Sequence, residues 1–90
     1  MENILIIDDE KSLLDLLSLV LKKEGYRVKT CLAPTKVFDI LEKEEHDLLI
    51  CDIKLPQISG MEVLKYVREN RPEVPVIMIT AYGSLKQAVE

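Results

Sequence analysis

The sequence lacks any segment long and apolar enough to cross a membrane. Its longest apolar runs, such as residues 4–7 and 74–79, fall far short of the roughly 20 residues that span a bilayer. No basic segment followed by an apolar stretch, the pattern of a secretory signal, opens the chain. With 48% hydrophobic and 31% charged residues, the composition is typical of a globular protein. We therefore expect a cytoplasmic protein with no membrane partner.

Cysteines and clustered basic residues are also scarce. The two cysteines, Cys31 and Cys51, lack the spacing of a zinc site, and both fall in strand-like segments. In a reducing compartment they are expected to be buried free thiols. The net charge of −4 and the absence of a basic stripe argue against direct nucleic-acid binding by this segment.

Strands and helices alternate along the 90 residues, which suffice for one domain. Such alternation predicts βαβ units and a parallel sheet of the α/β class. The predicted strands are 3–7, 26–31, 47–52 and 74–80, and the predicted helices lie at about 13–24, 34–45 and 60–70, with a fourth beginning at 84.

The first helix has an apolar stripe and recognisable ends. The stripe consists of Leu13, Leu16, Leu17, Val20 and Leu21, at helical spacing. Leu14 widens this stripe, and Leu19 lies off it. We expect Ser12 and Asp15 to cap the beginning of this helix and Gly25 to end it.

For the third helix, Ser59 and Glu62 form a predicted capping box. Pro72 lies just beyond its expected end near Asn70.

The polarity of the strands predicts their order. The first, third and fourth are apolar nearly throughout, so each is expected to be covered on both faces, whereas the more polar second strand belongs at an edge. The order 2-1-3-4 satisfies these constraints and places a topological switch point between strands 1 and 3. Asp8 and Asp9 follow strand 1, and Asp52 ends strand 3. The three acids are therefore expected to meet.

Three converging carboxylates repel one another unless a cation or protons neutralise them. Oxygen ligands of this kind suit a hard divalent cation such as Mg²⁺. Asp52 is then a candidate nucleophile for a phosphoryl group. Thr80 at the end of strand 4 offers a hydroxyl to a phosphoryl oxygen, and the backbone N–H of Ala81 is a second donor.

These motifs resemble those of the receiver domain of two-component response regulators. They comprise the acidic pair Asp8-Asp9, the segment DIKLPQISG at 52–60 and the segment MITAYGS at 78–84. The resemblance spans nearly the whole chain and implies a flavodoxin-like fold. The sequence of residues 75–90 looks most like that of receivers joined to AAA+ activators of sigma-54-dependent transcription.

The resemblance also implies roles for particular residues. Asp52 is the phosphoacceptor for a sensor histidine kinase, and Thr80 is the switch hydroxyl. Asp9 is a direct Mg²⁺ ligand, Asp8 acts mostly through water, and Lys54 offers its backbone carbonyl to the metal. Such a domain promotes its own phosphorylation and dephosphorylation rather than acting as a turnover enzyme. As its partner within the full-length protein, the resemblance implies a C-terminal output domain that regulates transcription.

The sequence departs from the family pattern at its end. Family members carry a fifth strand that ends in a lysine, followed by a fifth helix, and no residue here matches them. The chain is therefore interpreted as a receiver domain, residues 1–90, that is truncated at its C-terminus. The fourth strand would then be an unprotected edge, so we expect a dimer or swapped oligomer.

Two alternatives stay open at this point. A Mg²⁺-dependent phosphatase or phosphotransferase of similar topology would also use Asp52, but it usually needs a second acid just after the nucleophile. Here Ile53 and Lys54 follow instead. A receiver-like interaction module that works without phosphorylation is favoured by the missing lysine strand and disfavoured by the intact acids. The only histidine, His46, is expected to be a helix-end residue away from the acids, and residues 42–46 a solvated face.

Overall fold

The computed structural model describes residues 2–79 of the chain. Thr80, Ala81 and the helix predicted from residue 84 lie outside these residues. The strands are β1 (Asn3–Ile7), β2 (Arg27–Cys31), β3 (Leu48–Asp52) and β4 (Val76–Ile79). The helices are α1 (Lys11–Lys23), α2 (Val37–Lys43) and α3 (Gly60–Asn70), with a 3₁₀ turn, η1 (Pro34–Lys36), immediately before α2.

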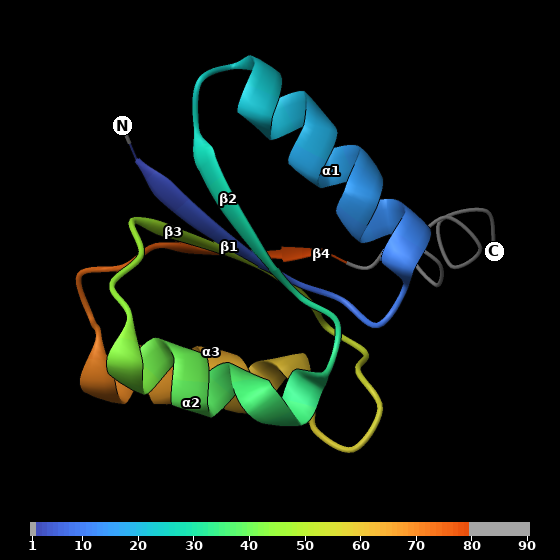
Figure 1. Cartoon of the computed structure of the whole chain (residues 1–90). Helices are drawn as coiled ribbons and strands as arrows, with labels where there is room; N and C mark the ends of the chain where they lie inside the picture. Colours follow the sequence, from blue (N-terminus) through green and yellow to red (C-terminus); the bar gives the residue numbers. More distant parts are fainter. Residues whose placement is uncertain (1, 80–90) are drawn as a thin grey trace, which may run out of the picture.

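The four strands form one parallel sheet in the order β2-β1-β3-β4, as predicted (Figure 1). Ile6 of β1 pairs with Thr30 on one side and with Ile50 on the other. The polar strand β2 lies at an edge of the sheet, which confirms the argument from its composition. The predicted α/β, flavodoxin-like arrangement is therefore confirmed for the strands that the structure describes.

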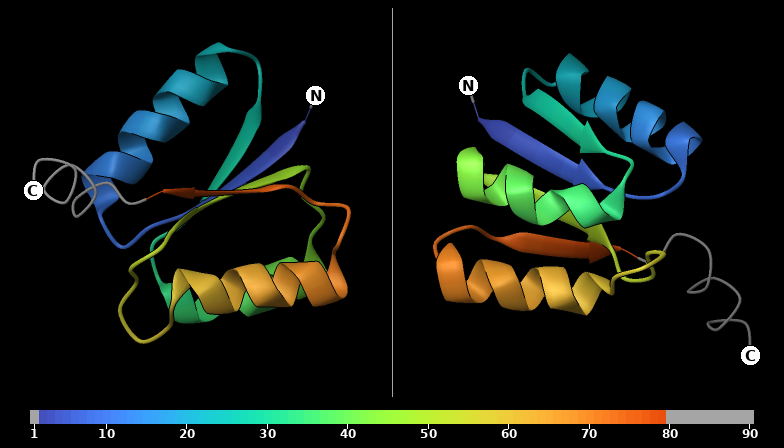
Figure 2. Two further views of the ribbon diagram at one scale, coloured as in Figure 1. Left: turned by 180° about the vertical axis from the view of Figure 1, so that it is seen from behind. Right: turned by 60° about the horizontal axis from the view of Figure 1, so that its bottom comes forward.

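Helices cover both faces of the sheet. The helix α1 lies on one face, and α2 and α3 lie together on the other (Figures 1 and 2). Alternate residues of β1 enter the two cores: Ile4 and Ile6 pack on the α1 side, and Leu5 and Ile7 on the α2–α3 side. All four side chains are 2% exposed or less, so β1 is buried on both faces as its sequence predicts.

The buried face of α1 differs from the predicted stripe. Leu14 is the one buried residue of this helix, and Leu17 and Leu21 pack beside it. Leu16 and Val20 are 56% and 50% exposed, so their assignment to the core-facing stripe was wrong. The apolar residues of this helix cover more than one face, and spacing alone does not tell which face meets the sheet.

The beginning of α1 was also predicted wrongly. The helix begins at Lys11, so Ser12 lies inside it, and its hydroxyl donates to Glu10 Oε1 rather than capping the helix with Asp15. The predicted end is confirmed. Gly25 follows the last turn with φ +95°, in the left-handed region that favours glycine, and its N–H donates to Lys22 O.

The second and third helices follow the prediction more closely. The segment predicted as one helix from Pro34 to Glu45 begins as the 3₁₀ turn η1, and α2 ends at Lys43. Ser59 caps α3 by accepting a hydrogen bond from Met61 N at 3.1 Å, which confirms the serine half of the capping box. Cys31 and Cys51 are buried free thiols, as expected.

Within residues 2–79, no helix combines the length and hydrophobicity that a membrane crossing needs.

Candidate metal and phosphoryl site

Three carboxylates meet at the carboxyl end of the sheet. The strands β1 and β3 are parallel neighbours, and Ile7 pairs with Cys51, so the residues that follow them come together. Asp8, Asp9 and Asp52 each offer an oxygen, and these oxygens all lie within 4.8 Å of one another. The predicted convergence of the three acids is therefore confirmed.

Asp8 is the buried member of this cluster, with 1% of its surface exposed. Its Oδ1 accepts a hydrogen bond from Glu10 N at 2.9 Å, whereas the buried Oδ2 has no partner among the described residues. Burial raises the pKa of Asp8, and the nearby carboxylates of Asp52 and Asp9 raise it further, against the opposing effect of the Glu10 hydrogen bond. The ionised form of Asp8 is thus poorly compensated by the protein alone.

Asp52 is half-buried at the end of β3. Its Oδ1 accepts a hydrogen bond from Lys54 N at 3.1 Å. Burial raises the pKa of Asp52, the Lys54 hydrogen bond opposes this, and the charges of Asp9 and Glu10 raise the pKa again. Asp52 is therefore a second carboxylate with a raised pKa, and its side chain lies close to that of Asp8.

The loop that follows Asp52 is held by backbone contacts on both sides. Ile53 N donates to Ile79 O at 2.8 Å, and Gly60 N donates to Ile53 O at 2.9 Å. Lys54 and Ser59 form an antiparallel bridge across the loop. Gln57 lies at its tip with φ +72°, an unusual conformation for a residue other than glycine. This closed loop fixes the peptide groups next to Asp52.

The residues of the site fit a hard divalent cation. Carboxylate oxygens are the ligands that Mg²⁺ uses, and a buried carboxylate oxygen without a hydrogen-bond partner is costly unless something binds it. Asp8, Asp9 and Asp52 are the side chains that would hold the ion. A divalent cation there would offset their mutual repulsion and the charge of a phosphoryl group.

Sequence reasoning placed some parts of the site better than others. The three acids were found from strand ends alone, and the predicted roles of Thr80 and Ala81 lie outside the described residues. The contribution of Glu10 was missed, because its backbone N–H rather than its side chain contacts Asp8. The signal was available, since an aspartate commonly accepts from the N–H two residues later in a turn.

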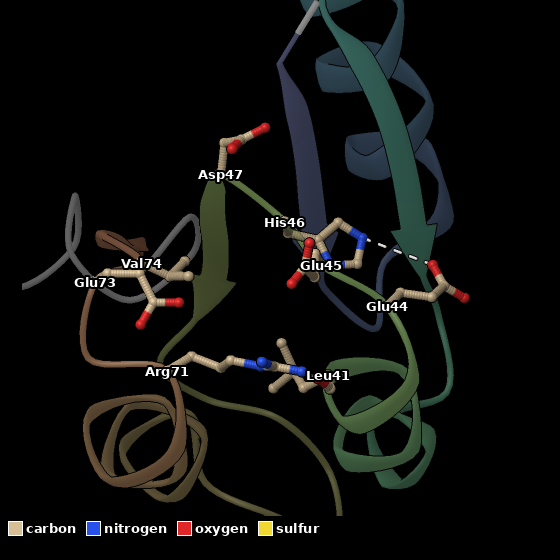
Figure 3. A pocket seen from close by; sticks show the side chains of 8 residues that line it. All are labelled: Leu41, Glu44, Glu45, His46, Asp47, Arg71, Glu73 and Val74. Atoms are coloured by element: carbon tan, nitrogen blue, oxygen red, sulfur yellow. Dashed lines mark hydrogen bonds and ion pairs between the residues drawn. The ribbon is translucent and has the colours of Figure 1, made fainter.

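The opposite, amino end of the sheet holds the only histidine. His46 follows α2 and precedes β3, far along the strand from Asp52, so it does not join the acids. Its side chain is 5% exposed, so His46 itself does not belong to the predicted solvated face of residues 42–46, whereas Glu42, Lys43 and Glu45 are exposed as predicted. Its Nε2 lies 3.8 Å from Glu44 Oε1, and both residues line an open cavity with Arg71 (Figure 3). Burial lowers the pKa of His46, against the opposing effect of Glu44.

The chain resembles several curated proteins. It is 38% identical to sporulation initiation phosphotransferase F of Bacillus subtilis over 89 residues, which cover 99% of the chain and 72% of that protein. It is 37% identical over 87 residues to the transcriptional regulatory protein GlrR of Escherichia coli. That match covers 97% of the chain but only 20% of the length of GlrR.

Solved structures show the same arrangement. The response regulator TrrA of Thermotoga maritima, in complex with Mg²⁺ and BeF, matches with a TM-score of 0.86 and 33% identity, over 97% of this chain and 76% of that one. The complex of the histidine kinase ThkA with TrrA matches with a TM-score of 0.84 and 35% identity, over 91% of this chain and 71% of that one.

The family model described as the response regulator receiver domain matches residues 4–90. This match covers nearly the whole chain, and the strand order and the acidic cluster agree with it. The chain therefore belongs to the response regulator receiver domain family of two-component signalling.

Proposed function

We propose that Asp52 accepts a phosphoryl group from a phosphohistidine of a sensor histidine kinase, with Mg²⁺ bound by Asp8, Asp9, Asp52 and the backbone carbonyl of Lys54. The observation that carries this proposal is the convergence of three carboxylates around a buried Asp8 oxygen that has no hydrogen-bond partner among the described residues. Within this set, Asp9 binds the ion directly and Asp8 acts mostly through water.

The group transfer needs little from the protein beyond positioning and charge compensation. A carboxylate oxygen of Asp52 forms a bond to phosphorus as the phosphorus–nitrogen bond of the phosphohistidine breaks. The bonding electron pair stays on the imidazole nitrogen, and the phosphoryl oxygens keep their negative charge. The hydrogen bond from Lys54 N to Asp52 Oδ1 orients the carboxylate for this attack. Thr80 and the N–H of Ala81 donate to the phosphoryl oxygens.

Two related structures support the choice of ion and partner. TrrA was solved with Mg²⁺ and BeF, and TrrA also forms a complex with the histidine kinase ThkA. Their identities of 33% and 35%, each over more than nine-tenths of this chain, support similar binding by Asp8, Asp9 and Asp52. The domain would promote its own phosphorylation and dephosphorylation rather than turn over a substrate.

The wider role follows from the relatives. The likeness to GlrR, of which the chain spans 20%, supports a C-terminal output domain that regulates transcription, and we place the chain among receivers of sigma-54-dependent activators. We place this receiver domain, residues 1–90, in the cytoplasm and infer that it binds no nucleic acid itself.

The edge position of β4 among the described residues supports association of the chain with itself. Among the described residues, β4 pairs with β3 alone, and its Ile77 is 49% exposed. An open strand edge next to apolar side chains is a template for pairing with another chain. Light scattering should therefore detect a dimer or a swapped oligomer, and a strictly monomeric species with a cooperative melt would contradict this part of the proposal.

Labelling with acetyl phosphate tests the central claim. In the presence of Mg²⁺ the chain is expected to acquire one acid-stable, base-labile phosphate at Asp52, identified by mass spectrometry of its peptides. Asp52→Asn should abolish the label, because the amide oxygen is a far weaker nucleophile than a carboxylate. Asp47→Asn is the matched control, since Asp47 lies at the other end of β3. If a longer chain and the 90-residue chain both remain unlabelled, Asp52 is not a phosphoacceptor.

A further inference from the structure

The first residue of α3, Gly60, lies against the backbone at the end of β3. A Cβ built on Gly60 would lie 2.8 Å from Ile53 Cα and 2.9 Å from Met78 Cε, and closer still to the backbone oxygen of Asp52. Real Cβ atoms essentially never approach other atoms this closely. Any side chain at position 60 would therefore have to push some part of this contact away.

Space, rather than backbone conformation, explains the need for glycine here. Gly25 is the glycine with a positive φ in residues 2–79, and Gly60 does not share that conformation. Of the three nearest neighbours of Gly60, the Met78 methyl group belongs to a flexible side chain and can move. The Asp52 oxygen and Ile53 Cα belong to the backbone that follows the proposed phosphoacceptor, and they move only if Asp52 moves too.

Hydrogen bonds connect the same contact to the acidic cluster. Gly60 N donates to Ile53 O at 2.9 Å, and Ile53 N donates to Ile79 O at 2.8 Å. The next residue, Lys54, donates from its N–H to Asp52 Oδ1. The close approach of α3 thus holds both peptide groups on the carboxyl side of Asp52.

We propose that Gly60 is a positioning residue: its missing side chain lets α3 press on the Asp52–Ile53 peptide, which sets the Asp52 carboxylate against those of Asp8 and Asp9. This inference rests on the proposed function of the three acids as a Mg²⁺ and phosphoryl site. Gly60 touches neither ion nor phosphoryl group, and it acts only through the backbone of Asp52.

Helix propensity predicts the opposite effect of a substitution, which makes the test sharp. Alanine is a better helix former than glycine, and Gly60 begins α3, so Gly60→Ala should stabilise the protein if only the helix mattered. If the contact with Asp52 matters, Gly60→Ala should destabilise the protein and also weaken Mg²⁺ binding. Loss of a residue that orients a metal ligand typically lowers metal affinity by about 10–100-fold.

The experiment compares Gly60→Ala with Gly25→Ala in the full 90-residue chain. Gly25 has a strained φ for alanine but nothing within 4 Å of its Cβ position, so Gly25→Ala is a matched control that destabilises without touching the site. Titration calorimetry with Mg²⁺ should give a dissociation constant about tenfold or more higher for Gly60→Ala. The constant of Gly25→Ala should stay within about twofold of the wild-type constant, as expected for an independent site. Equal Mg²⁺ affinity of Gly60→Ala and wild type would overturn the inference.

A second substitution separates the backbone contact from the Met78 contact. Met78→Ala removes the flexible neighbour of Gly60 and leaves the Asp52 oxygen and Ile53 Cα in place. We therefore expect the double variant, Gly60→Ala with Met78→Ala, to bind Mg²⁺ as weakly as Gly60→Ala alone. Full recovery of the affinity would assign the effect to Met78 and contradict the role of Gly60 in positioning Asp52.

Amide NMR in EDTA tests the inference independently of the ion. Gly60→Ala should shift the amide signals of Asp52, Ile53 and Lys54, whereas Gly25→Ala should leave them unchanged. If wild type binds no Mg²⁺, the proposed function fails, while these signals still decide whether Gly60 positions Asp52.

A wild-type measurement covers the case in which Gly60→Ala does not fold. Mg²⁺ binding should then slow hydrogen exchange of the Gly60 amide more than that of the Gly25 amide, which donates to Lys22 O away from the site. Equal slowing at the two amides would count against the inference.

Discussion

Charged side chains at the two ends of the sheet differ in the interaction partners that they find. At the amino end, Lys29 Nζ lies 2.5 Å from Glu44 Oε2. Asp47 Oδ2 accepts from Asn3 N at 2.8 Å, and Asp47 N donates to Asn3 O. Arg71 donates from its guanidinium to the carbonyl oxygens of Leu41 and Glu42 at the end of α2. These charged groups find partners within the described chain.

At the carboxyl end, the acids of the cluster have no such cationic partner among the described residues. The salt bridges found in residues 2–79 involve none of Asp8, Asp9 and Asp52. The hydrogen bonds that Asp8 and Asp52 accept come from backbone N–H groups, which offset only part of a carboxylate charge. Both ends hold a buried polar atom without a partner in residues 2–79, His46 Nδ1 and Asp8 Oδ2, but only at the carboxyl end do three carboxylates meet.

Removal of one acid should have the largest effect on the response to Mg²⁺. A ligand that binds only the folded state at about 100 times its dissociation constant adds about 2.7 kcal/mol to the free energy of unfolding. This increment is the difference between the free energies of unfolding measured in urea with and without Mg²⁺. We expect Asp9→Asn to lose most of it, because Asp9 is the proposed direct ligand. Asp47→Asn, at the amino end, should keep it. An unchanged Mg²⁺ response in Asp9→Asn would contradict the metal site.

Without Mg²⁺, removal of the buried charge should stabilise the fold. In Asp8→Asn the amide oxygen can still accept from Glu10 N, and the unpartnered buried charge is gone, so the free energy of unfolding in EDTA should rise by about 1–2 kcal/mol at neutral pH. Because the folded-state pKa of Asp8 is raised, wild type regains stability as the pH falls through that pKa. The difference between Asp8→Asn and wild type should therefore shrink in acid.

The matched change at the amino end should act in the other direction. Glu44→Gln loses the ion pair with Lys29. The side chains of Glu44 and Lys29 are 41% and 45% exposed, so the free energy of unfolding should fall by only about 0–1 kcal/mol. If Asp8→Asn destabilised the metal-free protein as Glu44→Gln does, the contrast between the two ends would be wrong.

The smallest expected effect is the acid sensitivity of His46. Its pKa is lowered from 6.5 in the folded state, so the unfolded chain binds a proton first as the pH falls below 6.5. The free energy of unfolding therefore decreases as the pH falls from 6.5 to the lower folded-state pKa of His46. Above pH 6.5 the protonation of His46 contributes nothing to the pH dependence. Lys29, Glu44 and Asp47 are the charged neighbours that adjust this pKa.

His46→Gln should remove this part of the pH dependence. Compared by urea unfolding at about pH 7.5 and pH 5.5, the variant is expected to lose less stability than wild type, by under about 1 kcal/mol. Equal losses in the two proteins would show that His46 protonates as easily in the folded state as in the unfolded state.

The success of sequence reasoning varied with how local the deciding interactions are. Gly25 and Ser59 act on their own helix ends, and both were predicted correctly. The inward face of α1 depends on how the helix lies on the sheet, so Leu14 rather than Leu16 turned out to be buried. The beginning of α1 is an exception, because this local feature was predicted wrongly: the helix begins at Lys11, and the Ser12 hydroxyl donates to Glu10 instead of capping it.

The sequence by itself determined the alternation of strands and helices, the polarity that puts β2 at an edge, and the strand-end positions of Asp8, Asp9 and Asp52. These features depend on residue type and local period, which are written along the chain. Only the tertiary structure decided that Asp8 is the buried acid, that His46 is enclosed, and that Gly60 touches the backbone of Asp52. Each of these depends on how different helices, strands and loops pack against one another, and neither composition nor spacing records such packing.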